Sequence, residues 1–133
     1  MKKIVSVIMA MLMCLACSIS VFAETRAVGS ATRTSTLTIS SATATCYSMY
    51  RDASASTSKV VITQSLQKQG LFWTWSTYAG EWTKTTNGSS ASLSNKIYNL
   101  ESGTYRVKTV FTVTDTSGVT ETITVYSGEK SIS

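Results

Sequence analysis

Apolar and polar side chains alternate along most of this chain with a period of two, the spacing of a half-buried β-strand. The pattern is clearest over residues 103–127, where two alternating runs flank the polar segment Asp115-Thr116-Ser117-Gly118. The inward positions of these runs are Tyr105, Val107, Thr109, Phe111, Val113, Val119, Ile123 and Val125. Two such runs joined by a short turn predict a β-hairpin.

Shorter alternating runs precede this hairpin. We expect strands at residues 36–40, 44–50, 59–68, 71–78, 81–85 and 91–98. Turns are expected at Ser41–Thr43, at Asn87-Gly88 and, as a tight two-residue turn, at Ala79-Gly80. No segment after the N-terminal region has a helical period. Seven or eight short strands at this spacing predict an all-β fold, a single antiparallel β-sandwich.

The N-terminal 23 residues have the three-part layout of a secretory signal peptide. Lys2 and Lys3 give a positive start, an apolar run follows over residues 4–16, and Val21-Phe22-Ala23 supplies the small residues of a cleavage site. We therefore expect cleavage near Ala23/Glu24 and a secreted or cell-surface protein, with a bacterial source. The alternative is lipidation at Cys17. Residues 24–33 are expected to be a flexible leader, residues 34–133 the β-sandwich domain, and the mature chain is expected to have no membrane span.

Composition excludes several classes of function. The sequence contains no histidine, so the Ser-His-Asp and Cys-His sites and most zinc sites are excluded. The formal charge of +5 drops by two when Lys2 and Lys3 are removed, and the other basic residues are scattered, which disfavours a nucleic-acid partner. The acidic residues show no convergent pair of the glycosidase kind. We expect no enzyme activity, no catalytic residue, no metal and no cofactor.

Only one of the three cysteines, Cys46, lies beyond the predicted signal peptide. No intrachain disulfide can then form in the mature chain. Cys46 is expected to be a small buried apolar residue, and the alternative is intermolecular pairing.

One segment supports a narrower interpretation of the sandwich. The run Leu100-Glu101-Ser102-Gly103-Thr104-Tyr105-Arg106-Val107 resembles the entry to the penultimate strand of fibronectin type III and related immunoglobulin-like domains. The resemblance implies that Tyr105 is the residue of a tyrosine corner, bonding back to the backbone, and that Val107 points into the core. The chain departs from antibody domains at Val107, where those domains have a cysteine. The chain as a whole is also similar to small secreted Gram-positive proteins of unknown function.

The tryptophans are the candidate binding residues. Trp73, Trp75 and Trp82 fall within ten residues, with Glu81 beside them. With a turn at Ala79-Gly80, the three indoles would share one side of a hairpin and could stack on sugar rings. Two alternatives remain open: all three pack in the core, or one is buried and two are exposed.

These features predict a secreted, non-catalytic binding or surface-interaction module whose ligand is a glycan or a protein. The alternative is a secreted effector or antimicrobial-type protein that acts on other cells. The sequence leaves the oligomeric state and the identity of the ligand open.

Overall fold

The computed structural model describes residues 31–133, so the predicted signal peptide and most of the predicted leader lie outside the described residues. The described chain forms eight β-strands and one short 3₁₀ turn, η1, in agreement with the predicted all-β sandwich. In chain order they are β1 (Ala31–Ser40), β2 (Thr43–Asp52), β3 (Thr57–Gln69), η1 (Leu71–Trp73), β4 (Trp75–Asn87), β5 (Ser90–Ile97), β6 (Gly103–Asp115), β7 (Thr120–Tyr126) and β8 (Lys130–Ile132).

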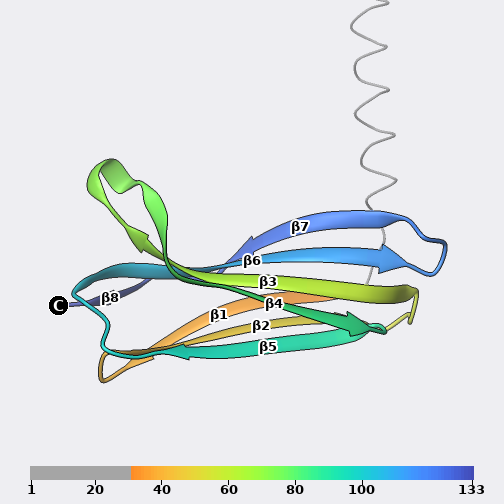
Figure 1. Cartoon of the computed structure of the whole chain (residues 1–133), viewed down its shortest axis with the longest axis horizontal. Helices are drawn as coiled ribbons and strands as arrows, with labels where there is room; N and C mark the ends of the chain where they lie inside the picture. Colours follow the sequence, from red (N-terminus) through yellow and green to blue (C-terminus); the bar gives the residue numbers. More distant parts are fainter. Residues whose placement is uncertain (1–30) are drawn as a thin grey trace, which may run out of the picture.

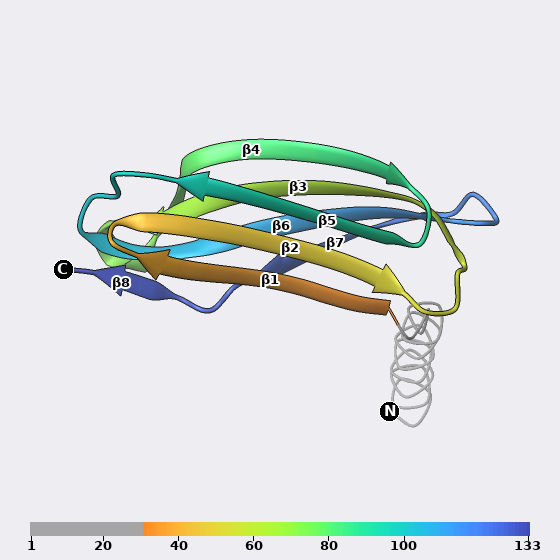
Figure 2. The same ribbon diagram turned by 90° about the horizontal axis from the view of Figure 1, so that it is seen from below.

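The strands form two antiparallel sheets that face each other as two layers (Figure 1). One sheet has the order β1-β2-β5. The other has the order β4-β3-β6-β7, and the short β8 pairs with the start of β6. Figure 2 shows β4 and β5, which are consecutive in sequence, along the same side of the sandwich but in different sheets.

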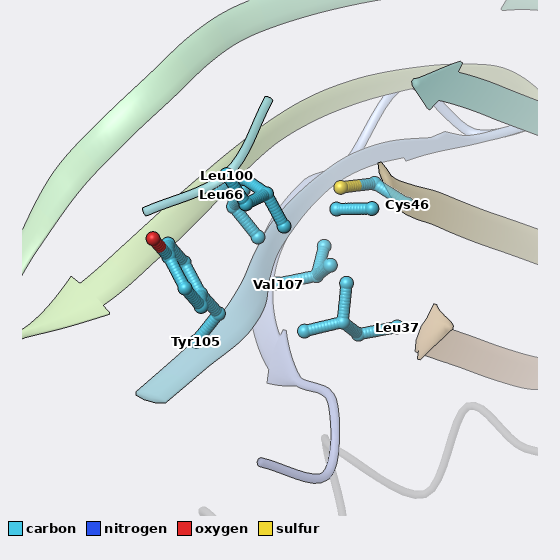
Figure 3. Packing of buried hydrophobic residues seen from close by; sticks show 7 residues of the cluster. Leu37, Cys46, Leu66, Leu100, Tyr105 and Val107 are labelled. Carbon is cyan, nitrogen blue, oxygen red and sulfur yellow. The ribbon is translucent and has the colours of Figure 1, made fainter. Parts of the chain in front are cut away.

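Two apolar clusters fill the space between the sheets. The first consists of Leu37, Ala44, Cys46, Leu66, Leu100, Tyr105 and Val107. In Figure 3 the side chains of Leu66, Leu100 and Val107 lie between those of Tyr105 and Cys46. The second consists of Tyr50, Val60, Ile62, Ala91, Phe111 and Val113. The alternation on β6 is confirmed, because Tyr105, Val107, Phe111 and Val113 are all buried. The predicted inward position of Val119 is wrong, because this residue precedes β7 and is exposed.

A layer of polar side chains separates these two clusters. On β2, β3 and β6 the inward position between the clusters is Ser48, Gln64 and Thr109, respectively, and each of these is fully buried. Gln64 Nε2 donates to Ser48 Oγ at 2.7 Å, and Ser48 Oγ lies 2.7 Å from Thr109 Oγ1. Half-buried Asn95 and Ser35 extend the network, at 2.9 Å from Gln64 Oε1 and 2.9 Å from Thr109 Oγ1. We call these five residues the polar layer.

The strand boundaries differ from the predicted ones in several places, among them residues 71–73, which form η1 instead of the start of a strand, and β8, which was not predicted. β1 already begins at Ala31, which the sequence places in the leader. The predicted turn at Ala79-Gly80 is wrong, because β4 runs without a break from Trp75 to Asn87 beside β3. Gly80 lies instead in a bulged stretch of β4, with a φ of 96° that favours glycine. A Cβ at this position would lie 2.8 Å from the ring of Trp82 and 3.0 Å from the carbonyl oxygen of Gln64.

Candidate interaction site

The chain reverses between β3 and β4 through a turn whose outermost residues are all apolar. Leu71, Phe72 and Trp73 are 82%, 94% and 79% exposed. In Figure 1 this turn projects from one end of the upper sheet, away from the other layer. We call these three residues the apolar tip. Isolated exposed apolar residues are common on protein surfaces, but three large ones in succession on a projecting turn are unusual.

The backbone of the apolar tip is strained. Phe72 and Trp73 have φ values of 58° and 59°, the left-handed region that side chains larger than glycine rarely adopt. The turn is closed by short hydrogen bonds. The amide N of Gly70 donates to the carbonyl of Thr74 at 2.7 Å, and the hydroxyl of Thr74 donates to the carbonyl of Leu71 at 2.7 Å. The fold thus holds two aromatic residues in a disfavoured conformation where they contribute no buried side chain.

Trp75 lies just below the apolar tip, on the outer face of the β4-β3-β6-β7 sheet. The guanidinium of Arg106 lies between two aromatic rings, 4.2 Å from the ring centroid of Trp75 and 4.0 Å from that of Tyr126. Arg106 Nε also donates to Gln67 Oε1 at 2.8 Å. One face of the Trp75 indole is therefore stacked on a cation at these distances.

Trp82 lies on the opposite side of β4 from Trp75. It pairs with Gln64, which points between the sheets, and it is half-buried. Glu81 is exposed and is the extra residue where the β3-β4 register shifts. The predicted shared row of Trp73, Trp75 and Trp82 is therefore wrong. The alternative that all three pack in the core is wrong as well, because Trp73 is exposed. The turn lies at residues 70–74 instead of 79–80, and the two register shifts in β4 further change which residues share a side.

Tyr105 and Cys46 both belong to the first apolar cluster. The hydroxyl of Tyr105 donates a 2.6 Å hydrogen bond to the backbone carbonyl of Glu101, four residues earlier. Cys46 is fully buried, and its desolvation raises the pKa of the thiol to about 12. A thiol with that pKa is protonated at neutral pH and is a poor nucleophile.

Two carboxylates hold loops at the end of the sandwich opposite the apolar tip. Asp52 accepts hydrogen bonds from the backbone and hydroxyl groups of Ser54 and Ser56 and from the hydroxyl of Thr57, at 2.6 to 3.1 Å. These bonds, that of Ser54 first, hold the pKa of Asp52 well below its ordinary value of 3.8. Asp115 accepts similar bonds from Ser117 and the amide of Val119, which also lower its pKa.

Within residues 31–133, no group of three His, Cys, Asp or Glu side chains is placed to hold a metal ion. No helix in the same range is long and apolar enough to cross a membrane.

Sequence reasoning missed Leu71 and Phe72 as surface residues. Both have high β-propensity or hydrophobicity, so they resemble the start of a strand. The available signal was Gly70, which follows the last alternating position of the preceding run and marks the place where β3 ends.

No protein-family model matches this sequence, and no curated protein matches it significantly.

Proposed function

We propose that this protein is an exported, non-catalytic binding module that contacts its target through the apolar tip. The observation that carries the proposal is the exposure of Leu71, Phe72 and Trp73 on a projecting turn. Burying a side chain of this size is worth roughly 1.5–3 kcal/mol. The folded chain gains little of this free energy at the apolar tip, so the gain is available to a binding partner.

The strain in the same turn supports this proposal. A left-handed conformation costs a residue with a side chain on the order of 1–2 kcal/mol. Phe72 and Trp73 both have it, although glycine or asparagine would fit these positions more easily. Residues held in sparsely populated conformations of this kind cluster at functional sites.

We also propose that the sandwich is immunoglobulin-like. Two observations support this. The strand order, β1-β2-β5 in one sheet and β4-β3-β6-β7 in the other, is compatible with that architecture. The bond from the hydroxyl of Tyr105 to the carbonyl of Glu101 is the contact expected of a tyrosine corner. A rigid sandwich of this kind commonly presents its binding residues at the ends of strands.

The proposal that the module is non-catalytic is supported by three carboxylates that are engaged in contacts within the fold. Asp52 and Asp115 hold their own loops, and Glu101 lies 3.1 Å from the ammonium of Lys68. A glycan remains a candidate ligand beside a protein or another apolar surface. Of the three indoles proposed for sugar stacking, Trp73 is the one at the tip and the most accessible.

Binding of the labelled, exported protein to intact bacterial cells tests the proposed function. The double variant Phe72→Ser/Trp73→Ser should lose most of this binding. The matched control is Tyr98→Ser/Val119→Ser, which removes two apolar side chains that are each 64% exposed outside the turn. The control should bind as the native protein does.

Equal binding by the native protein and the Phe72→Ser/Trp73→Ser variant would contradict the role of the apolar tip. A comparison of cells also addresses the alternative of an effector. Binding to the cells that export the protein favours a surface module, whereas growth inhibition confined to other cells favours an effector.

A further inference from the structure

We infer that the partner of the apolar tip is an anionic lipid surface, into which Leu71, Phe72 and Trp73 insert to the depth of the headgroup–acyl boundary. This inference rests on the proposed function and names its partner. It is carried by the shape of the tip, by its hydrogen bonds and by the charge around it.

The exposure of the apolar tip on all sides is better suited to insertion into a lipid bilayer than to binding in a pocket on a partner protein. Each of its three side chains is accessible over about four fifths or more of its surface. A protein pocket would have to enclose three successive residues on a projecting turn from several sides. A bilayer encloses whatever enters it, and indole rings concentrate at its interface because one edge is polar and the rest apolar.

Several backbone groups of the turn form hydrogen bonds within the turn, which lowers the free-energy cost of removing the turn from water. The amide N of Gly70 and the carbonyl of Thr74 bond to each other. The carbonyl of Leu71 accepts two hydrogen bonds from Thr74, one from the amide N at 3.3 Å and one from the hydroxyl at 2.7 Å. The hydroxyl of Thr74 is thus turned inward to the backbone at the base of the tip.

The charge around the tip complements an anionic surface. Two basic residues lie at the end of the sheet that carries the tip, Lys68 near the end of β3 and Arg106 near the start of β6. Lys68 is paired with Glu101 at 3.1 Å, whereas Arg106 bonds to the uncharged Gln67. Arg106 lies on the outer face beside Trp75, which pairs with the last residue of β3 directly below the tip. The formal charge of +5 becomes +3 when Lys2 and Lys3 are removed with the predicted signal peptide, so the exported chain is expected to stay basic. Basic side chains near an anionic bilayer strengthen its binding, and salt weakens the attraction.

Vesicle binding of the exported protein tests this inference. The probes are vesicles of phosphatidylcholine alone and mixed vesicles of phosphatidylcholine and phosphatidylglycerol. We expect co-sedimentation with the mixed vesicles that weakens as salt is added. Phe72→Ser/Trp73→Ser should lower the partition coefficient at least about tenfold, whereas Tyr98→Ser/Val119→Ser should leave it unchanged.

A conservative variant separates insertion from adhesion of the outer face. Trp73→Phe keeps an apolar tip, so it should still co-sediment with the mixed vesicles. The native protein should show a blue shift of its tryptophan emission and lower acrylamide quenching on binding, and Trp73→Phe should lose both changes. Retention of the blue shift in Trp73→Phe would overturn insertion of the tip.

Three further outcomes would overturn the inference. One is the absence of co-sedimentation with either kind of vesicle. The second is co-sedimentation that survives Phe72→Ser/Trp73→Ser. The third is self-association of the native protein in sedimentation velocity that the same variant abolishes, which would make a second copy the occupant. If tip-dependent cell binding persists without vesicle binding, the proposed function stands and the lipid partner does not.

Discussion

Gln64 and Phe72 belong to the same β-hairpin, and each lies where its side chain is disfavoured. Gln64 is fully buried between the sheets, whereas Phe72 is 94% exposed at the turn. The two regions differ in whether contacts within the protein offset the cost of the unfavourable placement. The amide of Gln64 bonds to Ser48 and Asn95 within the protein. For the ring of Phe72, the part of the chain that the structure describes supplies no comparable burial. Folding alone therefore accounts for the polar layer, whereas for the apolar tip we propose an interaction outside the fold.

Removal of one member of the polar layer should give the largest effect. Gln64→Ala leaves a cavity between the two apolar clusters and removes the partner of both Ser48 and Asn95. We expect a loss of about 3 kcal/mol in the free energy of unfolding. Urea denaturation followed by circular dichroism would measure it.

A concerted replacement is the control for this prediction. Ser48→Ala, Gln64→Leu and Thr109→Val together exchange the buried part of the layer for apolar side chains. Because no fully buried donor is left unpaired, this variant should lie within about 1 kcal/mol of the native protein. A triple variant as unstable as Gln64→Ala would show that the layer stabilises the fold by more than mutual satisfaction of its hydrogen bonds.

The loop after β2 offers a second contrast with the apolar tip, because the carboxylate of Asp52 fixes this loop through hydrogen bonds. The depressed pKa of Asp52 means that the ionised form stabilises the fold. This contribution is present above the unfolded value, near 3.8, and is lost as the pH falls below it toward the folded pKa. We expect Asp52→Asn to be less stable than the native protein at neutral pH and to lose less stability on acidification. Thermal unfolding from pH 7 to pH 2 would measure this difference.

Glu81→Gln is the comparison for that experiment, because it removes an exposed carboxylate. It should follow the pH dependence of the native protein. An identical acid response of the native protein and Asp52→Asn would mean that other carboxylates, Asp115 among them, govern acid unfolding.

The smallest effect is expected at the apolar tip itself. Phe72→Gly removes an exposed ring and relieves the left-handed strain, so the free energy of unfolding should stay equal or rise by up to about 1 kcal/mol. Chemical denaturation of both proteins would measure the change. Cell binding should fall in the same variant. A clear loss of stability would place the ring of Phe72 in the fold, and the contrast with Gln64 would then disappear.

Much of the fold follows from the alternation of side chains. The hairpin of β6 and β7 is predicted because its apolar positions repeat every second residue on both sides of Asp115-Thr116-Ser117-Gly118. The same period places Gln64, Ser48 and Thr109 inward, as the structure has them. Their hydrogen bonds join different sheets, and no local pattern reports which sheet faces which.

The candidate site could be predicted only in part. The cluster of tryptophans lies on the β3-β4 hairpin, which carries the proposed site, but Gly80 led to a wrong position for the turn. A positive φ at glycine serves a tight turn and a β-bulge equally well, so the local sequence does not distinguish them. Leu71 and Phe72 are of residue types that are usually found in the core. Their exposure depends on the end of β3 at Gln69, which the pairing with β6 and β4 determines.

The reactivity of Cys46 can report how often the folded protein opens. Once the predicted signal peptide is removed, Cys46 is the last cysteine in the chain, and the folded core both covers its sulfur and keeps it protonated. A thiol reagent can therefore modify the native protein only during excursions that separate the two sheets near Leu66 and Val107. The rate of that labelling, followed by mass spectrometry without any denaturant, reads out the frequency of these excursions under the conditions in which the protein works.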